Sequence, residues 1–78
     1  MSGLEWVPYD SRGTRTRIKE HVTRGAVEYE HCIEGGAYLI RRTERHDGGE
    51  RTVMETGRGM TRIAVLDLWK LIAVGDVG

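Results

Sequence analysis

The sequence predicts a small α+β domain in which a four-stranded antiparallel meander sheet packs its apolar face against one C-terminal helix. Three observations lead to this fold class. Short runs of β-favouring residues alternate apolar and polar side chains, glycine-bearing turns separate the runs, and the last apolar run has the length and period of a helix. A chain of 78 residues holds one hydrophobic core, so we expect a single domain over residues 15–78, preceded by an N-terminal arm over residues 1–14.

The alternating pattern defines four strands joined by three turns. Two of the turns contain Gly-Gly or Asp-Gly, which suit a tight hairpin because its central residues take positive φ. A four-residue connection over 22–25 joins the first two strands. The expected strands are 15–22, 26–33, 38–44 and 50–56, and the tight turns are Gly35-Gly36 and Asp47-Gly48.

Each turn implies a register for the two strands that it joins. Unlike charges directly opposite each other stabilise an antiparallel pair, so charge offers a test of these registers. Every hairpin contains at least one such pair, and the three registers therefore agree on one meander. The expected pairs are Ile33 with Tyr38, His31 with Ile40 and Glu30 with Arg41; Lys19 with Glu28, Arg17 with Glu30 and Ile18 with Tyr29; and Arg45 with Glu50 and Glu44 with Arg51.

The period of two assigns side chains to an apolar face and a polar face of the sheet. The residues expected on the apolar face are Ile18, Val22, Val27, Tyr29, Ile33, Tyr38, Ile40 and Val53. Those expected on the polar face are Arg15, Arg17, Lys19, Glu28, Glu30, Glu34 and Arg41. A helix over 61–74, capped by Thr61 and ended by Gly75, covers the apolar face with Ala64, Val65, Leu68, Leu71 and Ile72.

Charge and cysteine usage bound the functional class. Twelve basic and twelve acidic residues give a formal net charge of zero, which removes the long-range attraction that sequence-independent nucleic-acid binding needs. The lone Cys32 permits no internal disulfide, and no signal-peptide pattern or membrane-spanning apolar run is present. We therefore expect a cytoplasmic protein with no membrane partner. Two lysines against ten arginines, without Phe, Asn or Gln, indicate a GC-rich genome, such as that of an actinobacterium or its phage.

Candidate catalytic and metal-binding groups are few. The histidines and the cysteine match no zinc-ligand spacing, and His31 and Cys32 lie on opposite faces of one strand, so they cannot act together. We expect His31 to be half-buried in the core face, Cys32 to be a surface or interface thiol, and His46 to lie in a turn. No catalytic residue, metal site or cofactor is therefore predicted, and a small enzyme stays a residual alternative.

Arginines and one glycine-rich loop offer an alternative function in nucleic-acid or phosphate binding. Gly57-Arg58-Gly59 precedes the helix, where backbone N–H groups can hold a phosphate, although a flexible connection is favoured. Tyr29 and Tyr38 offer stacking surfaces for single-stranded DNA or RNA, but on the face that the helix should cover. In element order the chain is similar to the small coactivator-type single-stranded-DNA-binding proteins, in which four strands precede a dimerisation helix; architecture alone does not carry function. The nucleic-acid candidates are Arg41, Arg42, Arg45, Arg58 and Arg62.

Aromatic and apolar residues beyond the needs of the core favour a different function. Trp6 and Tyr9 belong to an aromatic cluster in the arm, which we expect to fold back onto the sheet edge or core, or otherwise to anchor a partner. Leu66 and Trp69 widen the apolar arc of the helix. The leading hypothesis is a non-catalytic interaction domain that recognises a protein partner or itself, as a homodimer, and that serves as an accessory in gene regulation.

Overall fold

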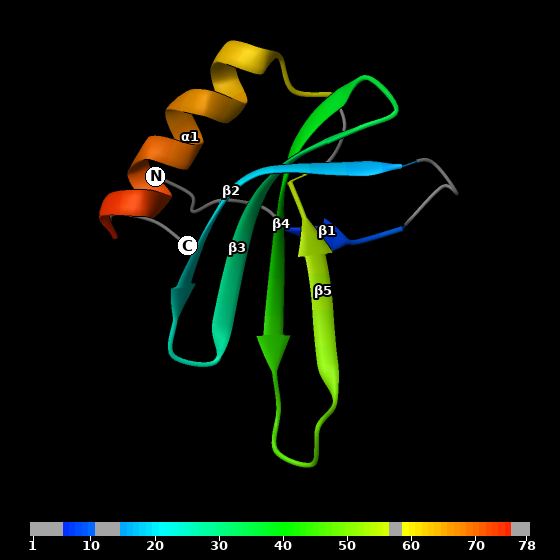
Figure 1. Ribbon diagram of the computed structural model, residues 1–78, viewed down its shortest axis with the longest axis vertical. Helices are drawn as coiled ribbons and strands as arrows, with labels where there is room; N and C mark the ends of the chain where they lie inside the picture. The colour runs from blue at the N-terminus through cyan, green and yellow to red at the C-terminus, as the bar shows by residue number, and fades with distance from the viewer. Residues whose placement is uncertain (1–5, 11–14, 57–58, 76–78) are drawn as a thin grey trace.

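The computed structural model describes residues 6–10, 15–56 and 59–75. It confirms an α+β fold with an antiparallel sheet and one C-terminal helix (Figure 1). The sheet has five strands in the order β1-β5-β4-β3-β2, and the prediction of four was wrong by one. The elements are β1 (Val7–Pro8), β2 (Thr16–Arg24), β3 (Val27–Glu34), β4 (Ala37–Arg45), β5 (Arg51–Glu55) and α1 (Arg62–Val74). Within the described residues, no helix has the length and apolar character needed to cross a membrane.

The additional strand, β1, comes from the N-terminal arm. Val7 lies opposite Glu55 and Pro8 opposite Met54, and the N–H of Tyr9 donates to the carbonyl of Val53 over 3.0 Å. Proline is tolerated here because β1 is an edge strand. A two-residue strand is too short to show an alternating pattern, so the sequence offered no signal for it.

The middle hairpin has the predicted register. Ile33 pairs with Tyr38, and Glu30 pairs with Arg41. Gly35 and Gly36 form the turn with φ values of 58° and 81°, a left-handed conformation that favours glycine at both positions.

The first hairpin differs from its prediction. Its turn is the two-residue Gly25-Ala26, so the expected pairs of Lys19 with Glu28, Arg17 with Glu30 and Ile18 with Tyr29 are wrong. Ile18 lies opposite Cys32 and Glu20 opposite His31, and the extra residue between them, Lys19, forms a β-bulge. The bulge moves Ile18 to the face opposite the one predicted. In Figure 1, β2 changes direction partway along its length.

The strand register of the last hairpin, β4 with β5, differs from the predicted register by one residue. His46 donates its N–H to the carbonyl of Glu50 over 2.8 Å, which leaves a connection of three residues, 47–49. Consequently Arg45 lies opposite Arg51, and the unlike-charge pairs expected here were wrong. A slip of one residue exchanges the two faces of a strand, so Val53 lies on the face away from the helix. His46 precedes the turn, close to its predicted place.

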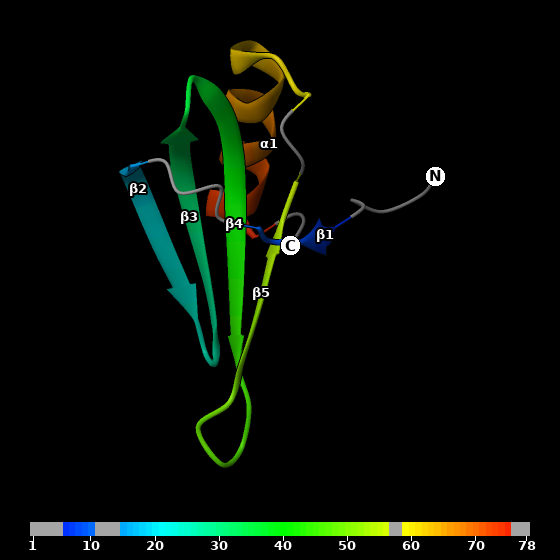
Figure 2. The same cartoon turned by 90° about the vertical axis from the view of Figure 1, so that its right-hand side faces the viewer.

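Helix α1 covers one face of the sheet, called the helix face here (Figure 2). Thr61 caps the helix by accepting the N–H of Ala64 over 3.1 Å, and Gly75 ends it. Trp6 packs on Tyr29 with ring centroids 6.1 Å apart, so the arm contributes to the core. The buried residues of this core are Tyr29, Ile40, Val65, Trp69 and Ile72.

The opposite face, called the second face here, was expected to be polar and solvated. Cys32 and Leu39 on this face are fully buried, and the carboxylates of Glu34 and Glu55 are nearly so. The prediction that Glu34 is solvent-exposed on the polar face was therefore wrong. Tyr9 contacts this face through a hydrogen bond that its hydroxyl donates to the Glu34 side chain.

Candidate functional site

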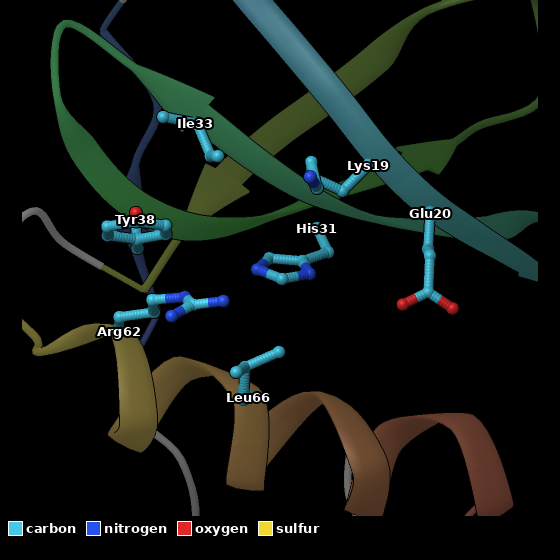
Figure 3. Close-up of a pocket in the computed structure, with 7 residues that line it drawn as sticks. All are labelled: Lys19, Glu20, His31, Ile33, Tyr38, Arg62 and Leu66. Carbon is cyan, nitrogen blue, oxygen red and sulfur yellow. The ribbon is translucent and has the colours of Figure 1, made fainter.

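A cavity of about 200 Å³ lies between the sheet and the first half of α1 (Figure 3). Strands β2, β3 and β4 form one wall and the helix forms the other. In Figure 3, Leu66 points from α1 toward His31, and the guanidinium of Arg62 extends toward the same ring. The lining residues are Lys19, Glu20, His31, Ile33, Tyr38, Arg62 and Leu66.

His31 forms the buried wall of this cavity. Its side chain is only 4% exposed, and neither ring nitrogen has a hydrogen-bond partner among the described residues. Burial lowers the pKa of His31, and the nearby charge of Glu20 partly opposes that effect. The ring is therefore neutral near pH 7, with one nitrogen as a donor and the other as an acceptor. The sequence placed His31 on the core face correctly, but its burial is deeper than expected.

The charged groups of the cavity come from two elements. The bulge in β2 brings Lys19 and Glu20 together at the position opposite His31, and both line the cavity. Arg62 is the first residue of α1, where the helix dipole adds partial positive charge. The sequence did not predict that Lys19 and Glu20 lie together opposite His31, because the alternating pattern of β2 gives no sign of the bulge.

The second face holds a hydrogen-bonded cluster around Glu34. The Tyr9 hydroxyl donates to Glu34 Oε2 over 2.5 Å, and the Thr16 hydroxyl donates to the same oxygen. Arg41 forms an ion pair with Glu30 over 2.8 Å and donates to the Tyr9 oxygen over 3.3 Å. In the described part of the chain, no three His, Cys, Asp or Glu side chains are grouped to hold a metal ion. The cluster joins the arm to the sheet.

Cys32 is fully buried on the second face within the single chain, whereas the sequence predicted a surface or interface thiol. Burial raises the pKa of its thiol to about 11. Because the thiolate is the reactive form, this position disfavours nucleophilic chemistry. His31 lies on the other face, as predicted, so the two side chains cannot cooperate.

The predicted partner-binding residues lie at separate places. Trp6 is half-buried against the core, and Tyr9 is half-buried in the Glu34 cluster. Leu66 lines the cavity, and Trp69 is 5% exposed in the core. The fold does not bring these four residues into one surface, and their role in partner binding stays a prediction.

The nucleic-acid candidates are also dispersed. Arg41 lies on the second face and pairs with Glu30, whereas Arg42 lies on the helix face and pairs with Glu44 over 3.5 Å. Arg45 donates to the carbonyl of Gly25 over 3.5 Å. Arg62 lines the cavity, and Arg58, like Gly57 of the candidate phosphate loop, lies outside the described residues. The described arginines therefore form no single basic groove.

Strand β2 is one edge of the five-stranded sheet. Hydrogen bonds of an antiparallel ladder alternate, so every second residue of an edge strand directs its N–H and C=O away from its neighbour. The two-residue turn makes Arg24 and Val27 a bonded pair, and the alternation then directs Thr23 and His21 outward. Beyond the bulge, the outward residues are Ile18 and Thr16.

The chain matches no protein-family model, and comparisons with curated proteins and with solved structures give no match.

Proposed function

We propose that this chain is a non-catalytic interaction domain that recognises a second copy of itself through strand β2. The observation that supports the proposal is the open edge of β2, which is nine residues long and has no neighbouring strand on its outer side in the described part of the chain. Unpaired edge groups are a template for pairing with another strand. Ile18, which is 48% exposed at this edge, would be partly covered by such pairing.

A second copy fits the edge in one antiparallel register. Outward-directed residues must face each other, which puts Ile18 opposite His21 of the second copy and Thr16 opposite its Thr23. The side chains of all four residues point to the second face in the single chain, so the paired sheets would form one continuous surface. The bulge is essential to this fit, because it changes which residues point outward on its two sides.

Charge supports the same register. This register places Lys19 opposite Glu20 of the second copy, and the two-fold symmetry of the dimer repeats this pair of unlike charges. A shift of one residue in either direction would place Lys19 opposite Lys19, or Glu20 opposite Glu20. Like charges directly opposite each other destabilise strand pairs, so β2 favours the register with the two unlike pairs.

A charge-reversal series tests the proposal. We expect sedimentation velocity to show concentration-dependent dimers of the wild-type chain. Lys19→Glu and Glu20→Lys should each weaken the dimer roughly tenfold, because each variant replaces two unlike pairs with two like pairs. The double variant should recover most of the wild-type affinity. Asp47→Lys, a similar charge change in an exposed turn, serves as the control and should leave the dimer unchanged.

A backbone test complements the charge test. Thr23→Pro removes an N–H that points away from β3, so it should weaken association while the hairpin remains folded. Thr23→Ala keeps the N–H and should associate like the wild type. A chain that stays monomeric at all accessible concentrations, or a double charge variant that does not recover affinity, would overturn the proposal.

A further inference from the structure

We infer that the cavity between His31 and Arg62 binds a monocarboxylate that carries a small apolar group. This ligand goes beyond strand pairing, because its proposed donors, His31 and Arg62, lie on β3 and α1, although Lys19 and Glu20 of β2 also line the cavity. The carboxylate would face His31 and Arg62, and the apolar group would contact Ile33 and Leu66.

The imidazole of His31 is the first support for a ligand. Buried side-chain nitrogens nearly always have a hydrogen-bond partner, yet both nitrogens of this 4% exposed ring have none among the described residues. The ring borders a cavity of about 200 Å³ that has room for a partner. A neutral imidazole carries one N–H, which can donate to a carboxylate oxygen.

The charge around the cavity favours an anion. Arg62 and Lys19 both line it, and α1 begins at Arg62 with no acidic residue in its first turn. The partial positive charge of the helix N-terminus is therefore not offset by an acidic side chain of that turn. Arginine also offers two parallel N–H donors that match the geometry of a carboxylate.

The remaining lining residues narrow the ligand class. Glu20 contributes a negative charge at the rim and would repel a dianion such as phosphate more strongly than a single carboxylate. Ile33, Leu66 and the ring of Tyr38 supply apolar surface beside the charged groups. A short branched acid and the C-terminal residue of a peptide present the same chemistry, namely a carboxylate next to a small apolar group.

A titration of the intact chain tests the inference and distinguishes the two sources. The probes are isovalerate, acetyl-Gly-Leu with a free carboxylate, acetyl-Gly-Leu-amide and inorganic phosphate. We expect the two carboxylates to shift the NMR signals of His31 and Leu66, with little response to the amide or to phosphate. Stronger binding of isovalerate would indicate a free acid, and stronger binding of the peptide would indicate a C-terminus.

Two variants locate the site. Arg62→Gln should weaken carboxylate binding at least tenfold, and because Arg62 is exposed at the helix start the fold should persist. Arg51→Gln, an equal change of charge on strand β5, away from the cavity, should bind like the wild type. No binding at millimolar carboxylate, equal binding of the amide, equal binding of phosphate, or an Arg62→Gln variant with unchanged affinity would each overturn the inference. Because Lys19 and Glu20 are unaltered in both variants, dimer formation can be scored separately in the same samples.

Discussion

The imidazole ring of His31 lies against the indole ring of Trp69, with centroids 5.8 Å apart and planes tilted by 32°. Trp69 is 5% exposed and belongs to the same core cluster as Val65 and Ile72 of α1. The cavity wall is thus built directly on the core. A change at Trp69 therefore acts on the fold and on the cavity together.

Replacement of Trp69 should mainly reduce stability. We expect Trp69→Ala to lower the free energy of unfolding by ~3–5 kcal/mol, because it removes a large buried aromatic side chain from a small core. Trp69→Phe should lose less, since it retains an aromatic ring. Urea denaturation followed by far-UV circular dichroism measures both values. A Trp69→Ala variant that keeps its stability but loses association would support the alternative, an interface role for this residue.

Stability should fall in mildly acidic solution because of His31. Burial lowers the pKa of this histidine below its ordinary value of 6.5, so the unfolded chain binds a proton more readily than the folded one. The stabilisation that depends on a neutral ring is complete above pH 6.5 and decreases as the pH falls toward the lowered value. Urea unfolding between about pH 7.5 and 5.5 measures the slope of the free energy of unfolding against pH.

Two histidine variants assign that slope. His31→Phe should flatten it, because the unfolded and folded states then no longer differ in protonation at this site. His46→Ala replaces an exposed histidine and should retain most of the wild-type slope. Equal slopes for the wild type and His31→Phe would contradict the assignment.

The thiol of Cys32 should be unreactive in the folded protein. It is fully buried, and burial raises its pKa to about 11, so little thiolate forms near pH 8. A thiol-reactive disulfide reagent should modify Cys32 rapidly in denaturant and slowly in its absence, with a rate that follows the opening of the fold. Rapid stoichiometric modification of the native chain would show that the second face opens readily.

The predictable part of the fold was local. Gly35-Gly36 favours a two-residue turn, and the alternation around it gave the register of β3 with β4 without error. The three-residue connection after His46 depends on which glycine completes the turn, and the sequence Asp-Gly-Gly permits either choice. Charge pairing favoured the wrong choice there, because a surface pair is worth only a few tenths of a kcal/mol.

The candidate site depends on features that are not local. The bulge at Lys19 is set by the pairing of β2 with β3, and no residue type in β2 requires it. Without the bulge, neither the grouping of Lys19 with Glu20 beside His31 nor the pattern of outward groups on β2 can be derived. The one available signal was His31 itself, a polar residue within the apolar series of Val27, Tyr29 and Ile33.

The cluster around Glu34 supplies the last prediction. Glu34 is 1% exposed, and the Tyr9 hydroxyl donates to its Oε2 over 2.5 Å. A buried carboxylate that loses a donor retains the cost of desolvation, so Tyr9→Phe should lower the free energy of unfolding by ~1–3 kcal/mol. Glu34→Gln replaces the carboxyl acceptor of this hydrogen bond with an amide, so Tyr9→Phe should cost less when it is made in a Glu34→Gln background.

A double-mutant cycle of Tyr9→Phe and Glu34→Gln measures this coupling from urea denaturation at neutral pH. We expect a coupling of ~1 kcal/mol, because the two side chains are in direct contact. Tyr38→Phe is the control. Tyr38 lies on the helix face, away from Glu34, so Tyr38→Phe should show no coupling to Glu34→Gln. Additive effects of Tyr9→Phe and Glu34→Gln would mean that the hydroxyl bond contributes nothing to holding the arm on the second face. In that case the other contacts of the arm, among them the pairing of β1 with β5 and the packing of Trp6 on Tyr29, would hold it in place.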